Sequence, residues 1–353
     1  MPRQLMMVEP GKLAIGEYEL PELGEGELRV KAEQAASKHG TEMAGFKEYG
    51  KRRGRFDREL GCYIRPDGEA DAAAGEAPAP FKPRPVGGNM FVGTVTELGP
   101  GVDGYAEGER VLGYGGFREV QTVRAGRQLW KVPADLDWRS AVCLDPADFA
   151  MAAVRDGHVR VGDAVAVFGM GAIGLMCVQI CRLSGAHPVI AVDPLEIRRA
   201  AAAGCGADLV LDPASDDAAL EVRKATQKRG ADVVIEYSGN VRAMQEAIRA
   251  CAFGGNVVAG AYPPPYPEGL DLGAEAHLNI PNIIFSRACS EPNREHPRWD
   301  EPRIYATCWR MICEGRLTGE PVVKPVVPFE KLPEEYMKVA TDPASNVKLG
   351  CEY

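Results

Sequence analysis

The sequence has no long apolar run and no excess of positive charge. No stretch approaches the roughly 18 uninterrupted apolar residues that cross a membrane, and the opening MPRQLMMVEP lacks the apolar core of a signal peptide. Acidic residues outnumber basic ones, 50 to 41, for a net charge of -9. That balance argues against general affinity for nucleic acid or anionic membranes. We therefore expect a cytoplasmic protein with neither kind of partner.

The 10 cysteines lack the spacing of a closed zinc site. Such a site uses pairs of cysteines separated by two to four other residues, with a second pair nearby. A chain of 353 residues is long enough to bury two cores without disulfides. Cys177 and Cys181 fall in an apolar helical stretch, as expected for one buried helix face. We expect reduced and mostly structural thiols.

The pattern of apolar and turn-forming residues changes about halfway along the chain. The first half has short alternating stretches bounded by glycine and proline, which predict antiparallel strands in a small barrel or sandwich at 27–33, 90–99, 109–115 and 118–125. From about residue 160, apolar runs occur at 164–168, 188–192, 208–211, 232–236, 256–260 and 282–286. Helical segments fall between them, at about 172–184, 195–204, 216–229 and 240–252. This alternation predicts an α/β domain whose parallel sheet is covered on both faces.

A glycine motif joins the first of these strands to its helix. Gly169, Gly171 and Gly174 permit, in turn, a tight turn, close approach of the backbone to a pyrophosphate, and close packing of helix on strand. The helix then begins with Ala172 and Ile173, whose backbone N–H groups face the phosphates. Because the triplet opens a strand–helix–strand unit, it predicts a dinucleotide site.

An aspartate ends the next strand. Asp193 is placed to accept both ribose hydroxyl groups and to repel a 2′-phosphate, so we expect NAD in preference to NADP. Arg198 weakens that preference, because arginine accepts a 2′-phosphate; its alternative role is a solvated helix face. The fourth and fifth strands end at Ser238, Gly239 and Gly260, on the carboxyl edge of the sheet. These residues line the nicotinamide half of the cleft or are ordinary turn residues.

Taken together, these features resemble the medium-chain dehydrogenase/reductase superfamily of alcohol and sorbitol dehydrogenases. The resemblance covers almost the whole chain and is carried by the glycine motif and by segments 93–113, 115–120, 145–154 and 234–240. It implies a Rossmann doubly wound parallel sheet (147–290) inserted in a GroES-like β-barrel catalytic domain, which residues 1–146 begin and residues 291–353 complete. It also implies hydride transfer at an alcohol or carbonyl carbon, and a homodimer or homotetramer.

The sequence departs from this family at the places where zinc-dependent members carry their ligands. His39 stands where a cysteine precedes the Gly-Thr stretch, and Gly88-Asn89-Met90 replaces the Gly-His-Glu triplet. Only Asp145 keeps a ligand type usual in the family, and the four-cysteine lobe that holds a structural zinc is missing. Since catalytic zinc needs three good donors and one open position, we expect no zinc.

Without a metal, hydrogen-bond donors or a general acid must act on the substrate oxygen. His39 is the first candidate, because histidine titrates near neutral pH and this position faces the substrate in relatives. Thr41 aligns with the hydroxyl residue that relays a proton, and Lys38 is a second candidate acid. Asn89 is a candidate donor to a substrate oxygen, and Asp145 orients His39 or binds a substrate hydroxyl. The alternative is that His39 and Thr41 are structural loop residues.

These observations lead to one functional hypothesis and two alternatives. The first is a zinc-independent, NAD-dependent oxidoreductase that interconverts a secondary alcohol and a ketone on a sugar, a cyclitol or another polyhydroxylated small molecule. The polyol substrate rests on analogy with sorbitol dehydrogenases through Asp145-Pro146. The alternatives are a quinone- or enoyl-type NAD(P)H reductase, and a nucleotide-binding sensor without turnover.

Overall fold

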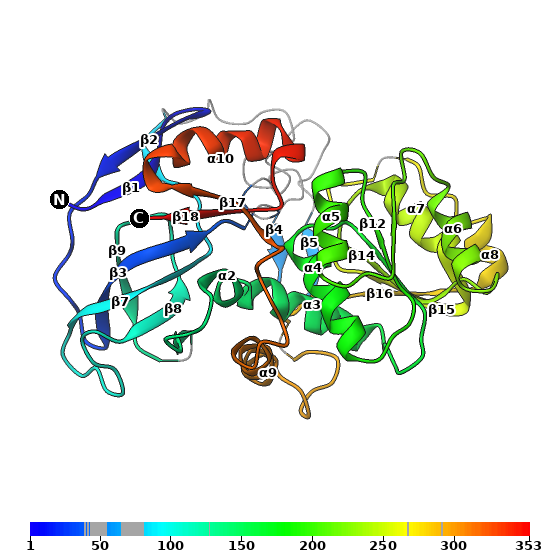
Figure 1. The fold of residues 1–353 in the computed structure, drawn as a ribbon, viewed down its shortest axis with the longest axis horizontal. Helices are drawn as coiled ribbons and strands as arrows, with labels where there is room; N and C mark the ends of the chain where they lie inside the picture. The colour runs from blue at the N-terminus through cyan, green and yellow to red at the C-terminus, as the bar shows by residue number, and fades with distance from the viewer. Residues whose placement is uncertain are drawn as a thin grey trace. The chain divides into compact units, whose positions relative to one another are not determined.

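The computed structural model describes residues 1–38, 40, 42, 55–64, 81–126, 128–266, 268–290 and 292–353. Two predicted catalytic residues, His39 and Thr41, lie outside these ranges. The chain divides into two compact units. In Figure 1 the N-terminal part of the first unit is blue to cyan and its C-terminal part is red, whereas most of the second unit is green to orange. The first consists of residues 1–131, 326–342 and 349–353, and the second of residues 132–325 and 343–348. The first unit is therefore built from both ends of the chain.

Antiparallel strands make up most of the first unit. Its larger sheet has the order β10-β8-β7-β3-β18-β17, with β9 also paired to β3. These strands are β3 (Glu27–Ala36), β7 (Met90–Leu98), β8 (Arg110–Tyr114), β9 (Val120–Arg124), β10 (Leu129–Lys131), β17 (Val323–Pro328) and β18 (Lys348–Glu352). The four strands predicted in the first half are all confirmed. They form because apolar side chains alternate toward the core, as Leu28 and Val30 do in β3.

Shorter elements complete this unit. They are β1 (Arg3–Glu9), β2 (Lys12–Glu17), β4 (Arg55–Asp57), β5 (Cys62–Ile64), β6 (Arg84–Pro85), the 3-10 helix η2 (Phe329–Lys331) and α10 (Leu332–Thr341). Strands β2, β1 and β6 form a separate sheet. Phe329, Leu332 and Tyr336, from the returning chain, are fully buried in the same core as Leu28 and Val30. The C-terminal segment is thus part of the core of the N-terminal fold.

The second unit is built on a parallel sheet of order β13-β12-β11-β14-β15-β16. Its strands are β11 (Val165–Phe168), β12 (Val189–Val192), β13 (Leu209–Leu211), β14 (Ala231–Glu236), β15 (Cys251–Ala259) and β16 (Asn282–Phe285). This is the strand order of a doubly wound dinucleotide-binding sheet, and its switch point lies between β11 and β14. The predicted α/β class and all six predicted strands are confirmed.

Helices flank this sheet on both sides, as Figure 1 shows for α4 and α5 on one side and α6, α7 and α8 on the other. They are α4 (Ala172–Leu183), α5 (Glu196–Gly204), α6 (Ala218–Ala225), α7 (Val241–Ala250) and α8 (Glu275–Asn279). Helix α6 is shorter than the predicted 216–229. Gln227 and Lys228 have φ values of 56° and 66°, which a right-handed helix cannot contain.

The second unit also contains α2 (Trp138–Ala141), α3 (Leu144–Asp156), α9 (Glu301–Cys313) and the 3-10 helix η3 (Pro343–Ser345). Helix α3 packs against both α4 and α9. For that reason the compact unit extends to residues 132 and 325, beyond the predicted limits at 147 and 290. Within the described ranges, no helix is long and apolar enough to cross a membrane.

All ten cysteines are free thiols. Seven are buried, at positions 143, 177, 181, 205, 251, 308 and 351. Burial raises the pKa of Cys143 to about 12, and it raises the pKa of Cys177 as well. Thiols of this kind stay protonated near neutral pH and act as small apolar side chains.

Candidate cofactor and catalytic sites

The turn between β11 and α4 is shaped by its three glycines. Gly169 has a φ of 90°, and a Cβ atom added there would lie 2.6 Å from the backbone nitrogen of Ser238. At Gly174 an added Cβ would lie 1.9 Å from the carbonyl oxygen of Gly169. At Gly171, in contrast, no atom of the described part of the chain, its own neighbours in sequence aside, lies within 4 Å of the added position. The turn is therefore closed on the protein side and open at Gly171.

Helix α4 begins at this open side. Gly171 is its N-cap, and no side chain caps the helix. The N–H groups of the first turn, which includes Ala172 and Ile173, therefore point out of the helix end with the positive end of its dipole. Both residues are partly exposed. This arrangement fits the pyrophosphate of a dinucleotide, as the glycine motif predicts.

Asp193 connects the glycine turn to the next helix. Its side chain is 3% exposed; Oδ2 accepts a hydrogen bond from the N–H of Met170 at 2.8 Å, and Oδ1 accepts one from the N–H of Leu195 at 2.9 Å. A carboxylate has further lone pairs, so this geometry leaves Asp193 able to accept ribose hydroxyl groups. Nη1 of Arg198 lies 3.9 Å from Oδ2 of Asp193. The predicted ribose-binding residue is thus also a structural link.

Glu236, which the sequence analysis did not single out, shapes the neighbouring turn. It is the last residue of β14, and its side chain is buried. Oε1 accepts hydrogen bonds from the N–H of Ser238 at 2.6 Å, from the N–H of Gly239 at 3.0 Å and from the Ser238 hydroxyl. This turn is the one that lies against Gly169. The available signal was an acidic residue ending the apolar run DVVIE.

Gly260 has a packing role. An added Cβ there would lie 2.4 Å from Cζ of Tyr237, so only glycine leaves room for the ring. The Tyr237 hydroxyl donates a hydrogen bond to the carbonyl oxygen of Phe149 at 3.1 Å. Gly239 has a φ of 69°, typical of a turn glycine. Contact of Gly239 and Gly260 with the nicotinamide stays a prediction.

Replacing Glu236 with glutamine is expected to make stability less dependent on pH. Burial raises the pKa of Glu236 above its ordinary 4.5, despite the hydrogen bonds from Ser238 and Gly239 that lower it. The stabilising contribution of such a group is full below pH 4.5 and is lost as the pH rises through the raised pKa. Glutamine cannot ionise, and its amide oxygen, which has two lone pairs, can still accept the two backbone hydrogen bonds from Ser238 and Gly239.

Thermal unfolding at a series of pH values measures this effect. The Tm of Glu236→Gln minus the Tm of the wild type should increase as the pH rises from 4.5. NADH affinity should stay within about threefold, because the turn keeps its two backbone hydrogen bonds. Glu107→Gln, at an exposed position, is the control. A constant Tm difference at all pH values would contradict the assignment.

In the first unit, Lys38 and Asn89 lie on adjacent segments. The N–H of Asn89 donates a hydrogen bond at 2.9 Å to the carbonyl oxygen of Ala36, two residues before Lys38. Asn89 is 8% exposed, and its Oδ1 has no hydrogen-bond partner within the described ranges. Buried amide oxygens are rarely left without a donor, so this atom is available to a bound group. Met90, beside it, is fully buried in the core.

Asp145 lies in the second unit. It is in the first turn of α3 and is 4% exposed. Within the described ranges, no group of three or more histidine, cysteine, aspartate or glutamate side chains is arranged to hold a metal ion. His39 and Thr41 are not described, so their predicted roles stay predictions.

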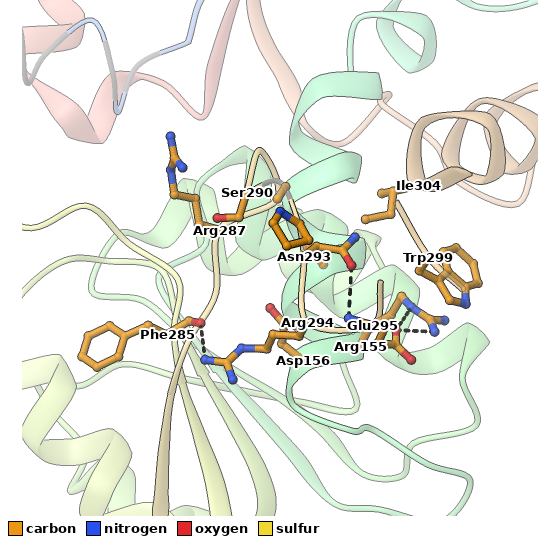
Figure 2. Close-up of a pocket in the computed structure, with 13 residues that line it drawn as sticks. Arg155, Asp156, Phe285, Arg287, Ser290, Asn293, Arg294, Glu295, Trp299 and Ile304 are labelled. Atoms are coloured by element: carbon orange, nitrogen blue, oxygen red, sulfur yellow. Dashed lines mark hydrogen bonds and ion pairs between the residues drawn. The ribbon is translucent and has the colours of Figure 1, made fainter. Parts of the chain in front are cut away.

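A cavity of about 400 Å³ lies in the second unit, between the end of α3, the end of β16 and the segment that follows it (Figure 2). Trp299 anchors this segment: the guanidinium carbon of Arg155 lies 3.6 Å from its ring centroid, and that of Arg303 lies 4.2 Å away. Glu295 accepts a hydrogen bond from Nε of Arg155 at 2.6 Å. Figure 2 shows Arg287 pointing away from Arg294, so these two side chains do not converge on one anion.

Comparison with known proteins matches the fold and the cofactor-binding region. A family model described as zinc-binding dehydrogenase matches residues 172–290. D-guloside 3-dehydrogenase of Escherichia coli K12 is 41% identical over 99% of this chain and 100% of its own length. Two solved structures share the fold, and each match covers 100% of this chain and 99% of the other chain. An alcohol dehydrogenase of E. coli CFT073 in complex with NADH has a TM-score of 0.74 and 19% identity. A dehydrogenase of Sinorhizobium meliloti 1021 bound to NADP has a TM-score of 0.75 and 20% identity.

Proposed function

Since the chain belongs to the medium-chain dehydrogenase/reductase family, we propose that it oxidises a secondary hydroxyl of a hexoside to the ketone with NAD. The observation that carries this proposal is the identity of 41%, over nearly the full length of both chains, to an enzyme named for oxidation at position 3 of a D-guloside. It supports hexosides as the substrate class. It also disfavours a sensor without turnover.

The cofactor would be held by the second unit. The open turn at Gly171 and the first turn of α4 would bind its pyrophosphate, and Asp193 its ribose. When bound, NAD supplies the hydride acceptor. We favour NAD over NADP because the buried carboxylate of Asp193 opposes a 2′-phosphate. If NADP binds, Arg198 is the residue that would pair with its 2′-phosphate.

The substrate-side residues would handle the proton of the reacting hydroxyl. His39 is assigned as the general base in oxidation and the general acid in reduction, with Thr41 as a relay and Lys38 as the second candidate. Asn89 would donate a hydrogen bond to a substrate oxygen through its amide nitrogen. Asp145 would accept one from a substrate hydroxyl, a role that suits a polyhydroxylated molecule.

We further propose that this chemistry proceeds without zinc. The support comes from donor chemistry: Asn89 and Met90 replace the histidine and glutamate of the family triplet, and neither amide nor thioether is a usual zinc ligand. Protein purified without chelator is expected to hold far less than one zinc per chain. Its turnover is expected to survive dialysis against EDTA. One tightly bound zinc per chain, with activity lost on its removal, would overturn this proposal.

Turnover itself is tested by following NADH formation with a panel of alkyl hexosides that differ in configuration at single carbons. We expect oxidation of hexosides with NAD, and the product should show a ketone at one ring carbon by NMR. A panel of simple alcohols, free polyols and quinones serves as the comparison. Turnover confined to quinones or simple alcohols would contradict the proposed substrate class.

The partner that we propose, besides the small-molecule substrate, is a second copy of the chain. Strand β16 is the last strand of the parallel sheet, and it carries Phe285, which is 73% exposed, and Ile283, which is 40% exposed. An exposed edge strand with apolar side chains is suited to pairing with another chain. We expect Phe285→Glu to shift the protein toward the monomer in light scattering. Val161→Glu, at an exposed apolar position before β11, should leave the assembly unchanged. An unshifted Phe285→Glu would place the interface elsewhere.

A further inference from the structure

One carboxylate holds both ends of the turn at 38–42. Oε1 of Glu42 accepts a hydrogen bond from the N–H of Lys38 at 2.9 Å, and the N–H of Glu42 donates to the carbonyl oxygen of Lys38 at 3.0 Å. Oε2 of Glu42 accepts a hydrogen bond from the hydroxyl of Tyr336 at 2.7 Å. Tyr336 belongs to α10, in the returning C-terminal segment. The turn is thus fixed by a residue almost 300 positions along the chain.

The ring of Tyr336 also packs against the second turn that carries a predicted catalytic residue. At Gly87, where φ is 72°, an added Cβ would lie 2.7 Å from Cε2 of Tyr336. Two residues later the same turn reaches Asn89. Tyr336 is 1% exposed, and its ring meets that of Phe117 edge to face, with centroids 6.1 Å apart. The buried side chain of Tyr336 therefore contacts both Glu42 and the turn at Gly87.

The chemistry of the pair suits a permanent hydrogen bond. Burial and the charge of Glu42 raise the pKa of Tyr336, so its hydroxyl stays protonated and donates throughout the neutral range. A hydrogen bond from a hydroxyl to an ionised carboxylate is among the stronger kinds, and this one is partly shielded from solvent. Loss of that hydroxyl removes the hydrogen bond that joins the Glu42 side chain to α10, so Glu42 and Lys38 are held less firmly.

We propose that Tyr336, acting through Glu42, is a positioning residue that fixes Lys38, a candidate acid, for proton transfer at the substrate hydroxyl. Neither Tyr336 nor Glu42 needs to touch the substrate in this role. The inference rests on the proposed function, because it assigns these residues to the same reaction. It makes the C-terminal helix part of the catalytic apparatus, although the sequence motifs of the site all lie far from it.

Tyr336→Phe tests the proposal, because it removes the hydroxyl and keeps the ring. We expect kcat to fall by about tenfold or more, while the KM for the hexoside and the Kd for NADH change by less than about twofold. Glu42→Gln should show the same split. Tyr105→Phe is the control, since it removes a different tyrosine hydroxyl of the same unit, bonded at 2.8 Å to the carbonyl oxygen of Leu129. A kcat for Tyr336→Phe within about twofold of the wild type overturns the proposal.

Hydrogen exchange tests the pair without turnover, so that failure of the proposed substrate and failure of this inference are distinguished. If the wild type oxidises no hexoside, the proposed function fails. The inference still requires faster amide exchange in peptides covering residues 36–42 and 86–90 of Tyr336→Phe, and no change there in Tyr105→Phe. Unchanged exchange in both regions overturns it, as does a general rise across the whole first unit.

Discussion

His39→Ala is expected to lower kcat by about 100-fold or more, because a positioned acid–base group usually contributes that much to proton transfer. The Kd for NADH should be unchanged, since no residue assigned to the cofactor is altered. Steady-state kinetics with the hexoside, together with a fluorescence titration of NADH, measure the two quantities separately.

His277→Ala is the control for this substitution. His277 is an exposed residue of α8, and its loss should leave kcat unchanged. If His39→Ala keeps kcat within about twofold of the wild type, His39 is a structural loop residue. Lys38 would then be the remaining candidate acid.

Gly171→Ala is expected to weaken NADH binding by about 10- to 100-fold without lowering Tm. Apart from its chain neighbours, no atom of the described residues lies within 4 Å of the added methyl, so the fold has room for it and a bound pyrophosphate would meet it. Gly174→Ala has a different expected result. Its methyl would lie 1.9 Å from the carbonyl oxygen of Gly169, so Tm should fall by about 5 °C or more.

Gly204→Ala is the control for both glycine variants. Its methyl would lie 3.4 Å from Cβ of Pro321, an ordinary contact, at the end of α5. Binding and Tm should match the wild type. Wild-type NADH affinity in Gly171→Ala would mean that the dinucleotide does not pass close to this turn.

The sheet of the second unit was predictable because each of its strands is a short apolar run between turn residues. AVAVF predicted 164–168, and β11 spans Val165–Phe168. The end of α6 was not predictable, because Gln227 and Lys228 take left-handed backbone conformations that neither residue type favours. Tertiary packing, not local preference, decides that boundary.

The candidate site divides in a similar way. The glycine motif follows from local backbone requirements, so the sequence identifies it and the structure shows the reason at each position. The Glu42–Tyr336 pair had no local signal. It depends on the return of the chain, in which Gly350 of β18 pairs with Ala36 of β3, and a sequence pattern does not contain that register. For Glu236, the sequence shows an acidic residue at the end of a predicted strand, but it does not show the hydrogen bonds that the side chain accepts.

The two hydrogen bonds that Asp193 accepts from Met170 and Leu195 limit how this lineage can change its cofactor. Exchange of Asp193 for a small neutral residue would remove the charge that we propose opposes a 2′-phosphate, but it would also release the glycine turn from the start of α5. Arg198 takes part in neither hydrogen bond, although its Nη1 lies 3.9 Å from Oδ2 of Asp193, so a substitution there would leave both hydrogen bonds in place. In the roles proposed above, a substitution of Asp193 would therefore change both the cofactor preference and the turn, whereas a substitution of Arg198 would change the cofactor preference alone.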